Sequence, residues 1–353
     1  MAYGVLHEQP NSPGIRSALA IDPAAVSSKE IDPALQRLTE NGAICKALRG
    51  QVANLYQVGH SIRLFPFDFL LISTHCGDAP GYRWTYEFTD SEGFDRRLVV
   101  DLAVSFEAVR HSDDVKVTEF IRFVSLDGVD WNDREAKKAL YVGTAIQDFI
   151  ARARDDSFEP VHRGKVPRVR SSMALKMADG PFLMLPEAMA SKNSPIVFNN
   201  ACGSWHRLAG DFMFSGARCY LGTLFSVMDG EVEQVIERLF GRYYDKELAL
   251  SVWRAQNDVY RKDVRRPFVL CGCHFQRLLT HDASGGGNLK FVLAELAAGV
   301  ADWRREFARL IAARQLSQAK TVRGFIEFLV SEVTVFREFA AGRLPNAHYR
   351  RGR

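Results

Sequence analysis

The sequence predicts an α/β fold in which helices flank a mostly parallel sheet. Two dense apolar runs, residues 67–74 and 195–200, have the length of strands that are buried on both faces. The second run is followed by helix, strand and helix in turn, an order typical of a parallel sheet with helices on both faces. With 353 residues, 47% of them hydrophobic, the chain can form a large core, which excludes a disordered or fibrous protein.

Composition also limits the compartment and the partners. Lys and Arg number 46 against 42 Asp and Glu, an excess too small to indicate a nucleic-acid or membrane partner. Six cysteines are scattered through a chain too large to need disulfides, which predicts thiols in a reducing compartment. The start of the chain lacks a signal-peptide pattern and no apolar run is long enough to cross a bilayer, so we expect a soluble, cytoplasmic protein.

The first elements are expected to be two helices and a strand. Asp32-Pro33 is typical of an N-cap followed by a proline, and Asn41-Gly42 is a stop signal, so a short helix is predicted between them. A second helix is expected over residues 52–64. The apolar strand at 67–74 then ends at Thr74-His75-Cys76-Gly77.

An insertion at about 82–190 is expected to begin with antiparallel strands. Residues 82–89 and 96–106 alternate apolar and polar side chains on either side of the turn signal Asp90-Ser91-Glu92-Gly93, which predicts a hairpin. Residues 115–126 are expected to add a third strand.

Two further patterns complete the insertion. Residues 133–154 are helical in pattern. Residues 155–170 are basic and contain two prolines, which predicts a loop. We prefer a solvated loop to the alternative of a self-processing site.

The second half of the chain returns to alternating elements. A helix over 205–215 and a strand over 218–225 lead to a helix with one apolar stripe, formed by Val232, Val235, Ile236, Leu239, Phe240 and Tyr243. Residues 267–273 predict one more strand, and 288–341 predict a helical hairpin. We therefore divide the chain into a domain of residues 1–287 and a C-terminal helical extension with a basic tail, 288–353.

Reactive side chains follow both of the buried strands. His75 comes after the first and Cys202 after the second, and functional groups in open parallel sheets collect at the carboxyl ends of the strands. A thiol nucleophile needs an imidazole to accept its proton and backbone N–H groups to hold the oxyanion. Gly77 and Gly203 give the two turns the freedom to aim such donors. The sequence therefore predicts a Cys-His dyad.

The same motifs resemble those of caspase-like cysteine peptidases. Asn200-Ala201-Cys202-Gly203-Ser204 resembles their nucleophile motif, and LLISTHCG resembles the strand and His-Gly turn that carries the base. Residues 208–244 are similar to the region after the nucleophile in the CHAT subgroup and in separase, and residues 265–275 are similar to the closing strand. The resemblance implies a caspase-hemoglobinase-like sheet with a hairpin insertion.

The resemblance also implies roles for individual residues. Cys202 would be the nucleophile and His75 the general base. The oxyanion donors would be the N–H of Cys202 and that of Cys76 or Gly77, since Cys76 stands where the family usually has glycine directly after histidine. Because adjacent strand residues face opposite sides, we assign the Cys76 thiol to packing rather than to catalysis.

The resemblance further implies an acidic pocket for a basic substrate residue, since separase and several CHAT peptidases cut after basic residues, and the family position maps near the start of the helix that follows the third strand. The carboxylates available there are Asp229, Glu231 and Glu233. The alternative is that Asp229 N-caps the helix and the glutamates complement its dipole. We prefer capping for Asp229 and keep the pocket role for Glu231 or Glu233.

Two other groups of residues are assigned simpler roles. Cys271-Gly272-Cys273-His274, with His281 beyond, contains zinc-ligand types, but paired Cys-x-x-Cys spacings are absent, so we expect a strand and no metal. His206 is expected to be a solvent-facing helix residue.

We therefore expect a regulated cysteine endopeptidase that cleaves a protein substrate without a cofactor. The resemblance implies a switch in a bacterial defence pathway, antiviral or cell-death, that is turned on by an activating protein partner. We expect no membrane partner, and we expect nucleic acid to be involved only indirectly if at all. The insertion and the C-terminal helices are the segments available to that partner. The alternatives are a caspase-like scaffold of little activity that acts as a protein-interaction module, and a zinc-stabilised binding module.

Overall fold

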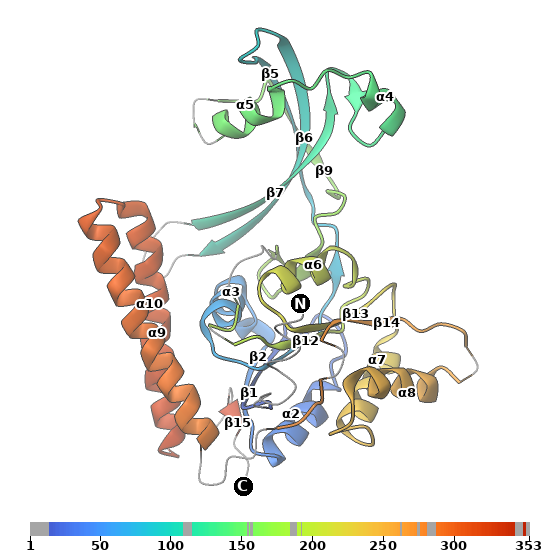
Figure 1. Cartoon of the computed structure of the whole chain (residues 1–353), viewed down its shortest axis with the longest axis vertical. Helices are drawn as coiled ribbons and strands as arrows, with labels where there is room; N and C mark the ends of the chain where they lie inside the picture. The colour runs from blue at the N-terminus through green and yellow to red at the C-terminus, as the bar shows by residue number, and fades with distance from the viewer. Residues whose placement is uncertain are drawn as a thin grey trace. The chain divides into compact units, whose positions relative to one another are not determined.

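Parallel strands form the centre of a sheet whose order within the described residues is β14-β13-β12-β3-β1-β2-β15 (Figure 1). The central strands are parallel to one another, and the edge strands β14 and β15 pair antiparallel with their neighbours. The bounds are Ser17–Asp22 (β1), Ile44–Arg49 (β2), Phe69–Ile72 (β3), Ile196–Asn199 (β12), Cys219–Thr223 (β13), Phe268–Gly272 (β14) and Tyr349–Arg350 (β15). The predicted α/β fold with a mostly parallel sheet is confirmed.

The sheet belongs to the first of two compact units. The structure is a computed structural model that describes residues 14–108, 115–153, 155, 158–183, 189–191, 193–261, 263–273, 276–280, 287–342 and 349–350. The first unit comprises Met1–Cys76, Glu107–Val115 and Leu175–Arg353, and the second Gly77–Phe106 and Lys116–Ala174. The second unit begins at Gly77, before the predicted insertion at about 82–190, and ends within it at Ala174, and the C-terminal helices fall in the first unit.

The strands β3 and β12 lie at the centre because all of their side chains are buried. Their apolar side chains on one face form a core with α2 (Ile31–Glu40), α7 (Asp229–Phe240) and α8 (Leu248–Val259). The ring of Phe69 lies 5.0 Å from that of Phe198 and 5.6 Å from that of Phe240, edge to face in both pairs. The ends of β3 and β12 are therefore held by a packed core.

The helices predicted in the first unit are present, and α8 and a short 3₁₀ helix were not predicted. Their remaining bounds are Gly50–Val52 (the 3₁₀ helix η1), Leu55–Leu64 (α3), His206–Phe214 (α6), Gly287–Ala312 (α9) and Leu316–Ala340 (α10). One detail is corrected: the N-cap of α2 is Glu30 rather than Asp32, which lies inside the first turn. The side chain of Glu30 does not cap the helix and instead accepts hydrogen bonds at the carboxyl edge of the sheet.

The C-terminal hairpin of α9 and α10 is fastened to the sheet by a buried ion pair. Lys46 of β2 is 2% exposed, and its Nζ lies 2.7 Å from Oε2 of Glu332 in α10. The ammonium also lies over the rings of Phe65 and Phe328, at 5.2 and 5.3 Å from their centroids. These contacts bury a charge that the sequence pattern of β2 alone would assign to solvent.

The second unit contains an antiparallel sheet of order β8-β7-β6-β5-β9. Its strands are Gly81–Thr89 (β5), Asp95–Ala108 (β6), Val115–Leu126 (β7), Val129–Asp130 (β8) and His162–Val166 (β9). Tyr86, Phe88, Leu98 and Val100 on one face pack against Phe149. The predicted hairpin and third strand are confirmed.

Two predictions in this unit are wrong. The helix expected at 133–154 is broken into α4 (Arg134–Lys138) and α5 (Ala145–Arg152), with Gly143 in the left-handed region at φ +49° between them. The segment expected to be a basic loop contains the edge strand β9, which pairs with β5 from Thr85 to Gly81. Charged side chains on an edge strand discourage pairing with other chains, which explains its basic composition.

Candidate active site

The two strands that precede His75 and Cys202 are neighbours in register. Ile72 of β3 is paired with Asn199 of β12, and the N–H of Asn200 donates to the carbonyl of Ile72 at 2.9 Å. Each candidate residue lies three positions beyond this pair. The loops that carry His75 and Cys202 therefore leave the same edge of the sheet side by side, as the sequence predicts.

The Cys202 loop is tied to the next strand, β13. The hydroxyl of Thr223 donates to the carbonyl of Ala201 at 2.8 Å, and the N–H of Thr223 donates to Oγ of Ser204 at 3.1 Å. Tyr220 donates its hydroxyl to the carbonyl of Ser204 at 2.8 Å, and burial raises the pKa of this phenol. Gly203 adopts the left-handed φ of +65° that the turn requires. These bonds fix the backbone of the turn that carries the thiol.

The thiol of Cys202 is half-buried and lies against the loop between β13 and α7. Its Sγ is 3.4 Å from the N of Val227 and 3.5 Å from the carbonyl oxygen of the same residue. Within the described residues no hydrogen bond joins Cys202 to His75. The two loops are brought together, and the sulfur contacts Val227 in this state.

His75 lies in an exposed loop that is fixed through its backbone. Its carbonyl accepts from the N–H of Lys176 at 2.9 Å, and Thr74 donates its hydroxyl to the carbonyl of Lys176 at 2.5 Å. Lys176 belongs to β10 (Ala174–Lys176), which lies between β4 (Cys76–Gly77) and β11 (Pro181–Phe182) in a small sheet. The imidazole is accessible while the main chain that carries it is held in place.

The proposed oxyanion donors lie on these same loops. Cys76 and Gly77 form the short strand β4 directly after His75, and Cys202 follows the end of β12. The turn at Gly203 directs the Cys202 segment, since only its left-handed φ allows the chain to reverse there. The N–H groups of Cys76 and Cys202 thus belong to segments that follow β3 and β12 at the carboxyl edge of the sheet.

The acidic residues at the start of α7 have local partners. The N-cap of α7 is Met228, so the predicted capping role of Asp229 is wrong, and Glu231 instead accepts from the N–H of Met228 at 3.1 Å. Asp229 accepts from the N–H of Ser27 at 2.9 Å, and Glu233 accepts from the hydroxyl of Ser27 at 2.6 Å. Glu231 also pairs with the guanidinium of Arg265 at 3.0 Å. Asp229 and Glu233 thus hold the segment that follows β1.

A buried carboxyl that the sequence did not single out lies between the two loops. Glu30 is 2% exposed, and its Oε1 accepts from the hydroxyl of Ser73 at 2.7 Å and from Nδ2 of Asn200 at 3.2 Å. Burial raises the pKa of this carboxyl above its usual 4.5, and the nearby Glu233 carboxylate raises it further, while the hydrogen bonds lower it. The sequence signal available for Glu30 is its position in Ser27-Ser28-Lys29-Glu30, which follows the apolar strand β1. That strand leads to the carboxyl edge of the sheet.

The raised pKa of Glu30 makes a prediction about stability and pH. The folded protein retains the Glu30 proton to higher pH than the unfolded chain, so this group lowers the free energy of unfolding as pH rises from 4.5 through its folded pKa. Glu30→Gln removes this dependence. We expect the variant to gain stability relative to the native protein across that interval, measured by urea denaturation at several pH values between about 4 and 8.

Asp22→Asn is the control for this prediction. Asp22 lies on the same segment and accepts from Ser28 at 2.8 Å, but it touches neither loop. The acidic group that acts on the Glu30 carboxyl through its charge is Glu233 of α7. A difference between Glu30→Gln and native protein that stays constant over the interval would contradict the assignment of the raised pKa.

His206 and the cysteines lie outside the pairing of the two loops or beside it, and His206 is solvent-facing as predicted. His206 is exposed at the start of α6, and its Nε2 lies 3.2 Å from the carbonyl oxygen of Leu224. No disulfide joins any of the six cysteines, all of which are in the described part of the chain. No group of three or more His, Cys, Asp or Glu residues that could hold a metal occurs among the described residues, while His274 and His281 lie outside them.

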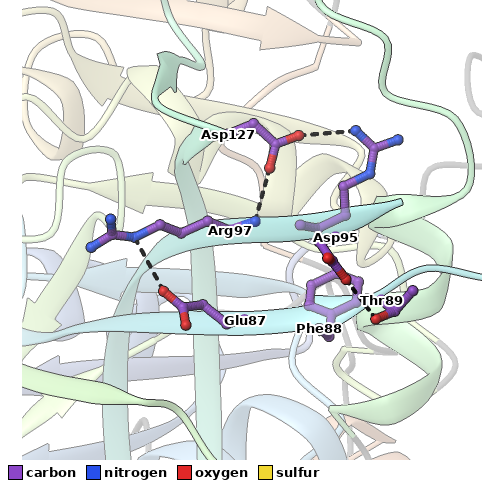
Figure 2. Close-up of a pocket in the computed structure, with 7 residues that line it drawn as sticks. Glu87, Phe88, Thr89, Asp95, Arg97 and Asp127 are labelled. Atoms are coloured by element: carbon purple, nitrogen blue, oxygen red, sulfur yellow. Dashed lines mark hydrogen bonds and ion pairs between the residues drawn. The ribbon is translucent and has the colours of Figure 1, made fainter. Parts of the chain in front are cut away.

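A pocket in the second unit contains no comparable chemistry. It is an open hollow of about 550 Å³ on β5 and β6. Its polar groups bond to one another: Asp127 accepts from the N–H of Arg97 and from Nη1 of Arg96, and Thr89 donates to Asp95 (Figure 2). No cysteine, serine or histidine lines it. We assign this hollow to the surface of the sheet rather than to a reaction.

Comparison with known proteins adds no further assignment. No protein-family model matches the sequence, and no curated protein shows significant similarity to it. Among the described residues, none of the helices combines the length and the apolar character needed to cross a membrane.

Proposed function

We propose that this protein is a caspase-like cysteine endopeptidase, similar to the CHAT peptidases and separase, in which Cys202 is the nucleophile and His75 the general base. The observation that carries the proposal is the register of β3 and β12, whose paired ends begin the loops of both residues. Neighbouring strands lie about 4.8 Å apart, so the two loops begin close to each other. An exposed imidazole and a half-buried thiol suit such a dyad.

The reaction follows from these two groups. His75 takes the thiol proton, and the Cys202 thiolate attacks the carbonyl carbon of the scissile peptide bond. The N–H groups of Cys202 and of Cys76 or Gly77 hold the oxyanion while His75 returns the proton to the leaving amine. Water, activated by His75, then hydrolyses the thioester. This route uses no cofactor.

The contact between Cys202 and Val227 supports a regulated enzyme. The sulfur must exchange its position beside the backbone of Val227 for one beside His75 before the dyad is complete. An activating protein partner that moves the loop between β13 and α7 is therefore part of the proposal. We place this switch in the cytoplasm, in an antiviral or cell-death pathway of bacterial defence, acting on a protein substrate.

The specificity of the proposed enzyme is assigned to the start of α7. Asp229 is exposed and Glu233 is half-buried, and their carboxylates face the segment that follows β1. A substrate Lys or Arg is the complementary partner for them. Glu231 is the least suited of the three to this role, because Arg265 already pairs with it at 3.0 Å.

A peptide that carries an electrophile after a basic residue tests the proposal. We expect it to modify Cys202 faster than the other five cysteines and expect His75→Ala to slow that modification by about 100-fold, because the thiol loses its general base. His206→Ala, which removes an exposed histidine next to the Cys202 loop, is the matched control and should label like the native protein. Labelling is measured by mass spectrometry of the modified peptides.

The alternative functions predict different outcomes of the same experiment. A scaffold that acts only as a protein-interaction module would show equally slow labelling of all six cysteines, unchanged by His75→Ala. A zinc-stabilised module built on Cys271 and Cys273 would contain stoichiometric zinc after purification. Equally slow labelling in a bacterial extract, which can supply the activating partner, would contradict the endopeptidase, and stoichiometric zinc would support the zinc-stabilised module.

A further inference from the structure

Glu30 connects the two loops of the proposed dyad through one oxygen. Ser73, which donates its hydroxyl to Oε1 of Glu30 at 2.7 Å, lies two residues before His75. Asn200, which donates its amide to the same oxygen at 3.2 Å, lies two residues before Cys202. The carboxyl is therefore a single acceptor for two loops that come from different strands.

The segment that carries Glu30 is braced on its other side. Ser28 donates to Asp22 at the end of β1, and Ser27 donates to Asp229 and Glu233 of α7. The carbonyl of Glu30 accepts from the N–H of Ala34 in the first turn of α2. Because bonds on both sides of Glu30 fix the segment that carries it, the Glu30 side chain restrains the two groups that it binds. The positions of Ser73 and Asn200 are therefore coupled.

The environment of the carboxyl favours its neutral form. Oε2 is buried without a hydrogen-bond partner among the described residues, and an ionised oxygen in that position would lack any compensation for its lost hydration. A neutral amide of the same length keeps an acceptor for Ser73 and Asn200. An apolar side chain of similar volume does not, and it leaves two buried donors unsatisfied.

We propose that Glu30 is a positioning residue that holds the His75 loop and the Cys202 loop in the relative register that the dyad requires. The inference rests on the proposed function and adds a residue to it. Glu30 touches neither the substrate nor the reacting atoms. It acts through Ser73 and Asn200, whose buried hydrogen bonds fix the starting points of both loops.

Two substitutions of similar volume separate this role from simple packing. Glu30→Gln keeps the acceptor and is expected to label Cys202 with the peptide electrophile within about threefold of the native rate. Glu30→Met fills the same space without an acceptor and is expected to slow labelling by about tenfold, the effect of losing one to two buried hydrogen bonds. Asp22→Asn, which alters a neighbouring carboxyl that contacts neither loop, should leave the rate unchanged.

The pH profile of labelling gives a second readout that packing alone would not change. A thiol paired with an imidazole reacts well below its ordinary pKa of about 8.5. In Glu30→Met we expect the profile to move towards that of an isolated thiol, and Glu30→Gln should restore the native profile. Thermal unfolding of each variant confirms that it is folded, and if Glu30→Met does not fold, Ser73→Ala removes one of the two hydrogen bonds in its place.

The outcomes distinguish this inference from the function on which it depends. If native labelling of Cys202 depends on His75 but Glu30→Met, or Ser73→Ala in its place, labels like the native protein, the role of Glu30 is excluded and the dyad remains. The role is equally excluded if Glu30→Gln is as slow as Glu30→Met. If native labelling ignores His75, the proposed dyad itself is wrong.

Discussion

Cys202→Ala is expected to abolish cleavage of protein substrates, with a loss on the order of 10⁴-fold or more, because no acyl-enzyme can form without the thiolate. The turn that holds Cys202 is fixed by Thr223, Tyr220 and Ser204 rather than by the thiol. We therefore expect the variant to fold normally, with a change in the free energy of unfolding below about 1 kcal/mol.

The loss of cleavage can be measured without knowing the substrate, by identifying the new protein N-termini that appear when the protein is added to a bacterial extract. The native protein should generate sites that Cys202→Ala does not, with basic residues before the cut. Cys271→Ala, which removes a half-buried thiol from the edge strand β14, is the control and should generate the native set. Identical cleavage by native protein and Cys202→Ala would rule out the assignment.

The second large effect concerns stability and the ion pair between Lys46 and Glu332. Glu332→Leu leaves the ammonium of Lys46, which is 2% exposed, buried without its carboxylate. We expect a loss of about 3–5 kcal/mol in the free energy of unfolding, measured by urea denaturation. Replacing both partners, as Lys46→Met with Glu332→Leu, should recover most of this loss, because no charge then remains to be buried.

An exposed pair on the same helix is the control for this prediction. Arg323 and Glu327 of α10 lie 3.2 Å apart with side chains 57% and 39% exposed. Water screens such a pair, so Glu327→Leu should change the free energy of unfolding by no more than about 1 kcal/mol. If Glu332→Leu behaves like Glu327→Leu, the buried pair does not fasten the hairpin of α9 and α10 to β2.

The sequence predicted those elements whose pattern comes from burial alone. The strands β3 and β12 consist almost wholly of apolar residues, and the stripe of α7 repeats at helical spacing, so both could be recognised. β1 and β2 were not predicted, although both are buried. Ser17 and Lys46 interrupt the apolar pattern of these two strands. Each is buried with a partner that is distant in sequence: the hydroxyl of Ser17 donates to the carbonyl of Pro66, and the ammonium of Lys46 pairs with Glu332.

Two errors in the second unit have the same origin. The strand β9 has the sequence of a basic loop, and it is a strand only because β5 offers its edge for pairing. The break between α4 and α5 depends on Gly143, whose left-handed φ the helical pattern does not reveal. In both places the local sequence leaves the structure open, and contacts with other segments decide it.

For the candidate site, the structure bears on the strands that precede its residues and not on their roles. His75 and Cys202 could be paired because apolar strands end just before them, and the register of β3 and β12 agrees with that expectation. Glu30 could not be found in this way, because its partners Ser73 and Asn200 are far from it in sequence. The sequence shows only that Glu30 follows an apolar strand, and it does not reveal the long-range bonds that bury it.

One covalent connection between the two units lies directly beside His75 in the chain. The chain passes from the first unit to the second after Cys76, returns for Glu107–Val115, and returns finally at Leu175, next to Lys176. The N–H of Lys176 is bonded to the carbonyl of His75, so the outgoing and the returning strand are clamped together at that point. The main chain of His75, the proposed base, is therefore held at the place where the chain passes from one unit to the other and back.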